Sequence, residues 1–297
     1  MGRLWWLVAA LTTVSALAVA LVLGCPPSDG APEPNPEATP HAAVPRGSEP
    51  PGSEPPGSEP PGSEPPGPSE AEIAEAVDRA AAATGVDLGL AVLDLATGAL
   101  AGHNGDTPFR SASLSKLVVA VDVLGAGASD QDRHYLQRAL SVSDDNAMNA
   151  LWVLHDGIGA ITRVAERAGL RNTTAPADPS QWGEVEMSAV DVVRLYQYVL
   201  RELPGEARDF IVSALSSAPT TAADGFDQGF GLLGLGGYTK QGWMYYLPAD
   251  LYLHSAGVVG DRYAVALLSV QTGVATATAR DNVTAIARTV VDALTDP

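Results

Sequence analysis

The chain has 297 residues, and its 35 acidic and 17 basic side chains give a formal net charge of −18. This excess of negative charge argues against a nucleic-acid partner and against a surface that adheres to anionic lipid, because both need clustered positive charge. The single cysteine, Cys25, excludes an intramolecular disulfide and a thiolate-rich metal site. Lys116 and Lys240 are the only lysines, and the other basic residues are all arginines.

Residues 1–25 have the form of an export signal, with Arg3 ahead of an uncharged apolar run that ends at Cys25. The run is long enough to span a bilayer, so an uncleaved anchor is the alternative. Its end, Val22-Leu23-Gly24-Cys25, resembles the bacterial lipobox, in which the cysteine is acylated and becomes the mature N-terminus. The resemblance favours an exported lipoprotein, held by lipid on Cys25 at the outer face of the bacterial cell membrane.

Residues 26–68 are rich in Pro, Gly, Ser and Glu, and the unit Gly-Ser-Glu-Pro-Pro occurs four times in residues 47–66. This composition builds no core and favours a disordered linker of extended polyproline II conformation. At roughly 3.1 Å per residue, the segment reaches on the order of 130 Å. It is interpreted either as a spacer that holds the following domain away from the membrane or as a tail of no selected length.

Residues 69–297 are predicted to form one globular domain. Hydrophobic periodicity and turn signals predict its elements in chain order. The expected elements are a helix at 69–84, strands at 88–95 and 99–103, helices at 113–124, 131–140, 146–155, 157–168 and 189–203, strands at 237–242, 251–259 and 263–271, and a helix at 276–294. This order predicts an α/β fold of the α+β type. Terminal helices pack on a five-stranded antiparallel sheet, and a helical subdomain is inserted between its second and third strands.

The first candidate for chemistry is Ser113-Leu114-Ser115-Lys116, which opens an apolar helix. Three-residue spacing places Ser113 and Lys116 on one helix face, and the helix N-terminus stabilises developing negative charge. A serine hydroxyl is a weak nucleophile that needs an adjacent base. A lysine supplies that base when burial or nearby positive charge lowers its pKa.

Two further segments are candidates for the active site. In Ser143-Asp144-Asp145 a serine ends a polar turn before a helix, where Ser143 or Asp144 is also a plain N-cap candidate. In Lys240-Gln241-Gly242 on a predicted strand, alternation puts the lysine and the glycine on one sheet face. The glycine is expected to let another molecule lie against the strand.

Together these segments resemble the Ser-x-x-Lys, Ser-x-Asn and Lys-x-Gly motifs of the penicillin-recognising serine enzymes, which include class A β-lactamases and D,D-peptidases. The order of motifs and the order of elements both match, over essentially all of residues 69–297. The two lysines of the chain occupy the two lysine positions of the motifs. An arginine at position 116 does not serve as a base, since it stays protonated.

The resemblance implies that Ser113 attacks a carbonyl and becomes acylated, while Lys116 accepts its proton. It implies that Ser143 passes a proton to the leaving nitrogen and that Lys240 sets the electrostatic field and attracts a substrate carboxylate. The backbone N–H groups of Ser113 and Trp243 are the implied oxyanion donors. No metal or organic cofactor is implied, and the protein is expected to act as a monomer.

Several implied substrate-binding positions depart from the family pattern. Asp145 replaces the usual Asn, so that an amide donor becomes a charged acceptor. Gln241 replaces a hydroxyl residue beside Gly242, and Trp243 is bulky where a small residue is expected. Asn149 keeps the spacing from the second motif that a structural Asn has in class A enzymes. No Arg occurs between positions 240 and 262, so the carboxylate-binding Arg of many class A enzymes has no counterpart.

The deacylating water needs a base, and class A β-lactamases place a Glu for it before the last helix of the helical block. The corresponding stretch, residues 176–188, contains Glu184 and Glu186 outside the usual sequence context. Glu184 is therefore only a possible deacylation base. The short distance between Ser113 and Ser143 along the chain also predicts an abridged helical subdomain.

Two other features are interpreted as structural. The G-x-G-x-x-G match at residues 229–234 has no strand before it and no helix after it, so it is read as a loop. His254 is interpreted as a packed or edge residue of a strand.

The sequence therefore predicts an active-site serine hydrolase that hydrolyses or is slowly acylated by β-lactams. The alternatives are a D,D-peptidase-like enzyme acting on peptidoglycan stem peptides and a catalytically eroded cell-wall or penicillin-binding module.

Overall fold

The computed structural model describes residues 67–82 and 85–295. The predicted signal with Cys25 and residues 26–66 of the predicted linker lie outside the described residues. A five-stranded sheet in the order β2-β1-β7-β6-β5 forms the centre of the described part, and all of its neighbouring strands are antiparallel. Its strands are β1 (Asp87–Asp94), β2 (Leu100–His103), β5 (Tyr238–Tyr246), β6 (Asp250–Val259) and β7 (Tyr263–Thr272).

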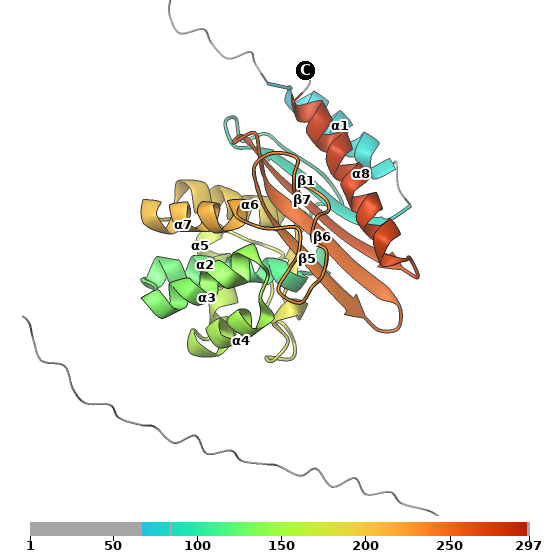
Figure 1. Cartoon of the computed structure of the whole chain (residues 1–297). Helices are drawn as coiled ribbons and strands as arrows, with labels where there is room; N and C mark the ends of the chain where they lie inside the picture. The colour runs from blue at the N-terminus through green and yellow to red at the C-terminus, as the bar shows by residue number, and fades with distance from the viewer. Residues whose placement is uncertain (1–66, 83–84, 296–297) are drawn as a thin grey trace, which may run out of the picture. The chain divides into compact units, whose positions relative to one another are not determined.

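The two faces of the sheet are covered by different helices (Figure 1). On one face, α1 (Glu70–Ala82) and α8 (Thr276–Thr295) lie side by side. On the other face lies the helical region α2–α7. Alternate residues of the central strands enter the two cores, and the strands are accordingly almost continuous runs of Val, Leu and Ala.

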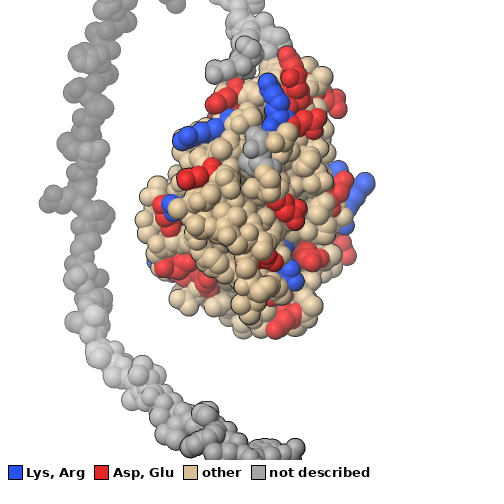
Figure 2. Space-filling view, turned by 90° about the vertical axis from the view of Figure 1, so that its right-hand side faces the viewer, with Lys and Arg blue, Asp and Glu red and all other residues tan. Residues whose placement is uncertain are grey.

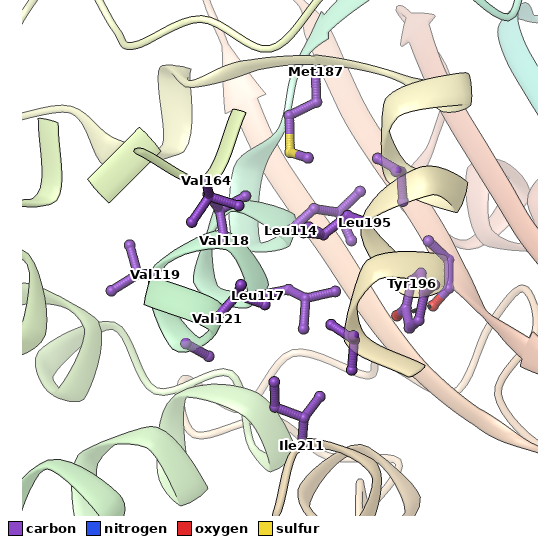
Figure 3. Packing of buried hydrophobic residues seen from close by; sticks show 14 of the residues in the cluster. Leu114, Leu117, Val118, Val119, Val121, Val164, Met187, Leu195, Tyr196 and Ile211 are labelled. Carbon is purple, nitrogen blue, oxygen red and sulfur yellow. Dashed lines mark hydrogen bonds between the residues drawn. The ribbon is translucent and has the colours of Figure 1, made fainter. Parts of the chain in front are cut away.

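The helical region is built from α2 (Ser115–Ala126), α3 (Asp130–Ser141), α4 (Asp145–Leu154), α5 (Gly157–Ala168), α6 (Ala189–Arg201) and α7 (Gly205–Ser216). Helix α2 is its centre, because its residues from Ser115 to Leu124 are all buried. Figure 3 shows its apolar side chains packed among those of the neighbouring helices. Because these residues are buried on every side of the helix, α2 is held in place from all directions.

The architecture expected from the sequence is confirmed, including the inserted helical region and the terminal helices on one face. One α-helix and two strands were absent from the sequence-based expectation. The helix is α7, and the strands are β3 (Pro108–Arg110) and β4 (Glu186–Ser188), which form a small sheet of their own. The strand expected at 237–242 is longer in the structure, since β5 continues to Tyr246.

The surface gives no sign of a charged recognition face on the side that Figure 2 shows, where α1 and α8 lie. Acidic and basic side chains are interspersed there. Across the described ranges, no helix is both long enough and apolar enough to cross a membrane.

Candidate active site

Ser113 lies in the short 3₁₀ helix η1 (Ala112–Leu114), directly before α2. The sequence predicted the start of an α-helix here, and the structure adds a tighter turn ahead of it. Ala112 has a φ of 47°, in the left-handed region that a residue with a Cβ seldom adopts. Ser115 stabilises the turn, because its hydroxyl donates to the Ala112 carbonyl at 2.9 Å. Such strained residues cluster at functional sites.

Lys116 is fully buried and its ammonium group lies at the centre of the site. Nζ donates to Ser113 Oγ at 2.9 Å, to the Ser143 carbonyl at 2.7 Å and to Asp145 Oδ1 at 2.6 Å. Ser143 Oγ lies 3.2 Å away as a fourth acceptor. An ammonium has three N–H donors, so these four acceptors share them. The structure thus brings the first and second motifs together around one buried amine.

The second motif forms the turn into α4. Ser143 has a φ of 56°, and Asp144 is the N-cap, accepting from the backbone N–H groups of Asn146 and Ala147. The N-cap interpretation of Asp144 is confirmed. Asp145 is the first residue of α4, and its side chain is 60% exposed although its carboxylate pairs with Lys116.

The third motif lies on β5, which passes beside η1. Lys240 Nζ donates to Ser143 Oγ at 2.8 Å and to the Gln241 carbonyl at 2.8 Å. Ser143 is therefore the hydroxyl that the two lysines share. A Cβ at Gly242 would lie 3.0 Å from the Ser111 carbonyl oxygen and 3.3 Å from the Ser113 nitrogen. The expectation that Gly242 leaves room for another molecule needs correction, because the protein's own backbone fills that space.

Gln241 does not reach the site. Its side chain is buried at 3% exposure, and its amide donates to the Phe230 carbonyl at 2.8 Å. Alternation along β5 explains this placement, since residues 240 and 242 point toward η1 and the helical region while 241 points to the opposite face. The substrate-binding role expected for the Gln241 side chain therefore has no support in the geometry.

Trp243 is held beside the site. Its indole stacks on Phe226 with ring centroids 4.6 Å apart and donates from Nε1 to Asp224 at 3.2 Å. Trp182, which no sequence motif marks, also lies at the site. Its ring centroid is 4.8 Å from the Lys116 ammonium, and its Nε1 donates to Asn149 at 2.8 Å. No motif marks Trp182 along the chain, because its position depends on the loop before β4.

These elements enclose a cavity of about 390 Å³, and Ser113, the candidate nucleophile, is one of the residues that line it. The residues that line it are Ala112, Ser113, Asp145, Asn149, Ser180, Gln181, Trp182, Gly183, Trp243 and Met244. Another cavity of about 520 Å³ lies beside β7 and α8, but no serine, lysine or histidine lines it. The chemistry that the motifs suggest is therefore found at the smaller cavity.

Burial and the two neighbouring charges set the protonation of the lysines. Burial lowers the pKa of Lys116 below its ordinary value, and the Asp145 carboxylate opposes that shift. Burial lowers the pKa of Lys240 well below its ordinary value, and the charge of Lys116 adds to the shift. Both shifts favour the neutral amine that a general base requires, while Asp145 favours the ammonium at Lys116.

Glu184 has a different partner from the one expected for a deacylation base. It ends the 3₁₀ helix η2 (Trp182–Glu184), and its carboxylate lies 4.0 Å from the Arg110 guanidinium. That guanidinium also donates to Tyr252 and Tyr246. The neighbours of Glu184 line the cavity but Glu184 itself does not. This placement gives no support to its role in activating water.

The remaining candidates are structural. His254 is fully buried, Nε2 is 2.8 Å from the Arg110 carbonyl, and Nδ1 accepts from the Ser269 N–H at 3.1 Å. Burial lowers the pKa of His254 to about 4, so the ring is neutral at pH 7. Its interpretation as a packed strand residue is confirmed. Residues 229–234 form a loop, as expected. In the described ranges, no three His, Cys, Asp or Glu side chains are arranged to hold a metal ion.

Comparisons with known proteins agree with this geometry. The model of the beta-lactamase enzyme family matches residues 70–132, which include the first motif. The chain is 36% identical over 233 residues to proteins of Mycobacterium tuberculosis and Mycobacterium bovis that carry the name lipoprotein LppW. The match covers 73% of this chain and 73% of each relative.

Solved structures share the fold. A beta-lactamase from Chitinophaga pinensis superposes with a TM-score of 0.62 at 18% identity, over 74% of this chain and 98% of its own. A class A beta-lactamase from Bacteroides cellulosilyticus superposes with a TM-score of 0.63 at 16% identity, over 77% and 99%. The described chain therefore has the class A beta-lactamase fold.

Proposed function

The chain belongs to the beta-lactamase enzyme family, and from that membership and the geometry of its cavity we propose that it is an active-site serine acyl hydrolase. The substrate is a β-lactam or another activated amide or ester, and the product of the first step is an acyl-enzyme on Ser113. One observation carries the proposal: the buried Lys116 amine lies 2.9 Å from the hydroxyl of Ser113, and Ser113 lines a cavity.

In the acylation step, Ser113 Oγ attacks the substrate carbonyl carbon while Lys116 Nζ takes the hydroxyl proton. This transfer requires the neutral amine, which burial favours. The carbonyl oxygen becomes an oxyanion, and the backbone N–H groups of Ser113 and Trp243 are its proposed donors. The close approach of β5 to η1 at Gly242 supports this pairing, because it brings the two backbones together.

When the tetrahedral intermediate collapses, the carbon–nitrogen bond breaks and the leaving nitrogen takes a proton. Ser143 is the proposed donor, because its hydroxyl lies within hydrogen-bond distance of both lysine amines. The proton that Lys116 removed from Ser113 thus returns through Ser143 to the leaving group. Lys240 holds the Ser143 hydroxyl in place and contributes to the electrostatic field.

Deacylation is the step with the least support from the described residues. Glu184 pairs with Arg110 instead of lining the cavity. This observation favours a second candidate function, in which the acyl-enzyme persists and the protein serves as a penicillin-binding module or a slow D,D-peptidase-like enzyme on stem peptides. The two candidates share the nucleophile and differ in turnover.

The location of the enzyme is also part of the proposal. The relatives are named as lipoproteins, and residues 22–25 resemble a lipobox, so lipid on Cys25 is proposed to anchor the chain to the outer face of the cell membrane. Residues 26–68 then act as a spacer that lets the catalytic domain, residues 69–297, reach a substrate in the cell wall.

Incubation with a fluorescent penicillin followed by intact mass measurement tests the proposal. An adduct on the wild type that is absent from Ser113→Ala is the expected result, and decay of the adduct with time distinguishes a hydrolase from a binding module. Absence of any adduct over several penicillins and cephalosporins contradicts the β-lactam part. An adduct that survives in Ser113→Ala contradicts the assigned nucleophile.

A further inference from the structure

The charges around the cavity are arranged with the carboxylates outside and the amines inside. Of the described residues that line the cavity, Asp145 alone carries a charged side chain. Its side chain is 60% exposed, whereas that of Lys116 is fully covered. Lys240 is buried as well. A ligand that enters from solvent therefore meets a carboxylate before it meets either amine.

A second carboxylate lies close by. Asp224 is exposed, accepts from Trp243 Nε1 at 3.2 Å and acts electrostatically on Lys116. No Arg or Lys of the described ranges forms an ion pair with Asp224, whose hydrogen bonds come from Trp243 and from the Phe226 backbone. Asp145 pairs with Lys116, so Asp224 contributes an uncompensated negative charge beside the cavity.

The usual partners of a substrate carboxylate are engaged elsewhere. Lys240 donates to Ser143 and to the Gln241 carbonyl, and the Gln241 amide donates to Phe230. The Arg110 guanidinium contacts two tyrosine hydroxyls and Glu184. An anionic ligand would therefore bring its charge next to two carboxylates without gaining an exposed basic partner.

The apolar lining favours the opposite charge. Trp182 and Trp243 both line the cavity, and the face of an indole attracts cations. Each ring already uses one face, Trp182 for the Lys116 ammonium at 4.8 Å and Trp243 for the stacked Phe226 ring, so a ligand cation would meet the second face. Indole faces together with carboxylates are the side chains by which proteins recognise ammonium and quaternary ammonium groups. Asp145 lines the same cavity as these two rings.

The geometry points to acyl donors that carry an ammonium or quaternary ammonium group as the preferred substrate class of this cavity, over acyl donors that carry a free carboxylate. The inference rests on the proposed function, because it concerns the substrate that Ser113 attacks. It assigns Asp145 and Asp224 as specificity-determining residues; the motif comparison marked Asp145 as a substrate-binding position and did not mark Asp224.

Three p-nitrophenyl esters of equal chain length test the inference, ending in a trimethylammonium, a tert-butyl or a carboxylate group. The readout is the second-order rate at which each ester acylates Ser113, followed by p-nitrophenol release and intact mass. We expect the cationic ester to react about tenfold faster than the anionic one, with the neutral ester between them, since tenfold corresponds to about 1.4 kcal/mol of differential interaction. Added salt is expected to reduce this ratio, because both carboxylates are reached by solvent.

The double variant Asp145→Asn/Asp224→Asn is expected to bring the ratio of cationic to anionic rates close to one. The ratio is the quantity to compare, because a change in the basicity of Lys116 alters all three rates alike. Asp281→Asn, which removes an exposed charge on α8, is the matched control and retains the wild-type ratio.

The outcomes separate the two claims. Equal rates for the three esters in the wild type, or a preference for the anionic ester, overturn the inference and leave the nucleophile in place. A ratio that the double variant does not change overturns the assignment of the two aspartates. Failure of the neutral ester to acylate Ser113 overturns the proposed function itself, and the inference with it.

Discussion

Asp145 is the departure from the family pattern with the clearest consequence for catalysis. Its carboxylate lies 2.6 Å from the Lys116 ammonium and stabilises the protonated form. An opposite charge at this distance raises the pKa of an amine, and Asp145 raises that of Lys116 both by its charge and by its hydrogen bond. Because the Asp145 side chain is 60% exposed, solvent screens part of this interaction, and burial still holds the pKa of Lys116 below its ordinary value.

Asp145→Asn keeps an oxygen acceptor for Lys116 and removes the charge. The acylation rate rises with pH as Lys116 loses its proton, so the variant is expected to reach half of its maximal rate at a lower pH than the wild type, since the charge that raises the pKa of Lys116 is gone. The assay is the rate of Ser113 acylation by a neutral ester between about pH 5 and 10.

The control Asp281→Asn removes a charge on α8 and is expected to leave the midpoint unchanged. An unchanged midpoint in Asp145→Asn, or a shift to higher pH, would show that this carboxylate does not control the protonation of Lys116.

Three further predictions concern other parts of the structure. Gly242→Ala places a methyl group 3.0 Å from the Ser111 carbonyl oxygen, and we expect the rate of acylation to fall about tenfold. The control Gly85→Ala, where the added methyl group meets no atom within 4 Å, is expected to leave the rate unchanged. Burial lowers the pKa of His254 from 6.5 to about 4 in the folded chain. As the pH falls, the unfolded chain therefore binds a proton at this histidine before the folded chain does. About 3 kcal/mol of the free energy of unfolding is lost between pH 6.5 and 4. Urea unfolding at several pH values measures this loss, and His254→Gln is expected to flatten the dependence in that window. Glu184→Gln is expected to leave the decay of the acyl-enzyme unchanged, because Glu184 pairs with Arg110; a decay slowed tenfold or more would restore its role as the base.

The main elements of the fold were predictable because their hydrophobic patterns are strong. Helix 157–168 was predicted with its observed bounds, since Gly169 in the left-handed conformation ends it. Helix α7 was missed although Pro204 precedes it and Ile211 and Leu215 are spaced for one buried face. The small sheet of β3 and β4 joins segments distant in the chain, and no local pattern reveals such a pairing.

The candidate site was predictable in its motifs and less so in its surroundings. The serines and lysines of the three motifs meet in the structure as the resemblance implied, because rigid elements carry them. The contribution of Trp182 depends on a loop conformation, and the direction of the Gln241 side chain depends on which face of β5 it occupies. The partner of Glu184 depends on Arg110, which is distant in sequence.

Mapping of the acyl group to a single residue identifies the nucleophile directly. Trypsin cleaves after Arg110 and after Lys116, so the nucleophile is released in the peptide Ser111–Lys116, which contains three serines. After reaction with a penicillin or the neutral ester and an acid quench, fragmentation of this peptide is expected to place the acyl group on Ser113. An acyl group on Ser111 or Ser115, or an unmodified peptide from a protein that has gained mass elsewhere, would contradict the account.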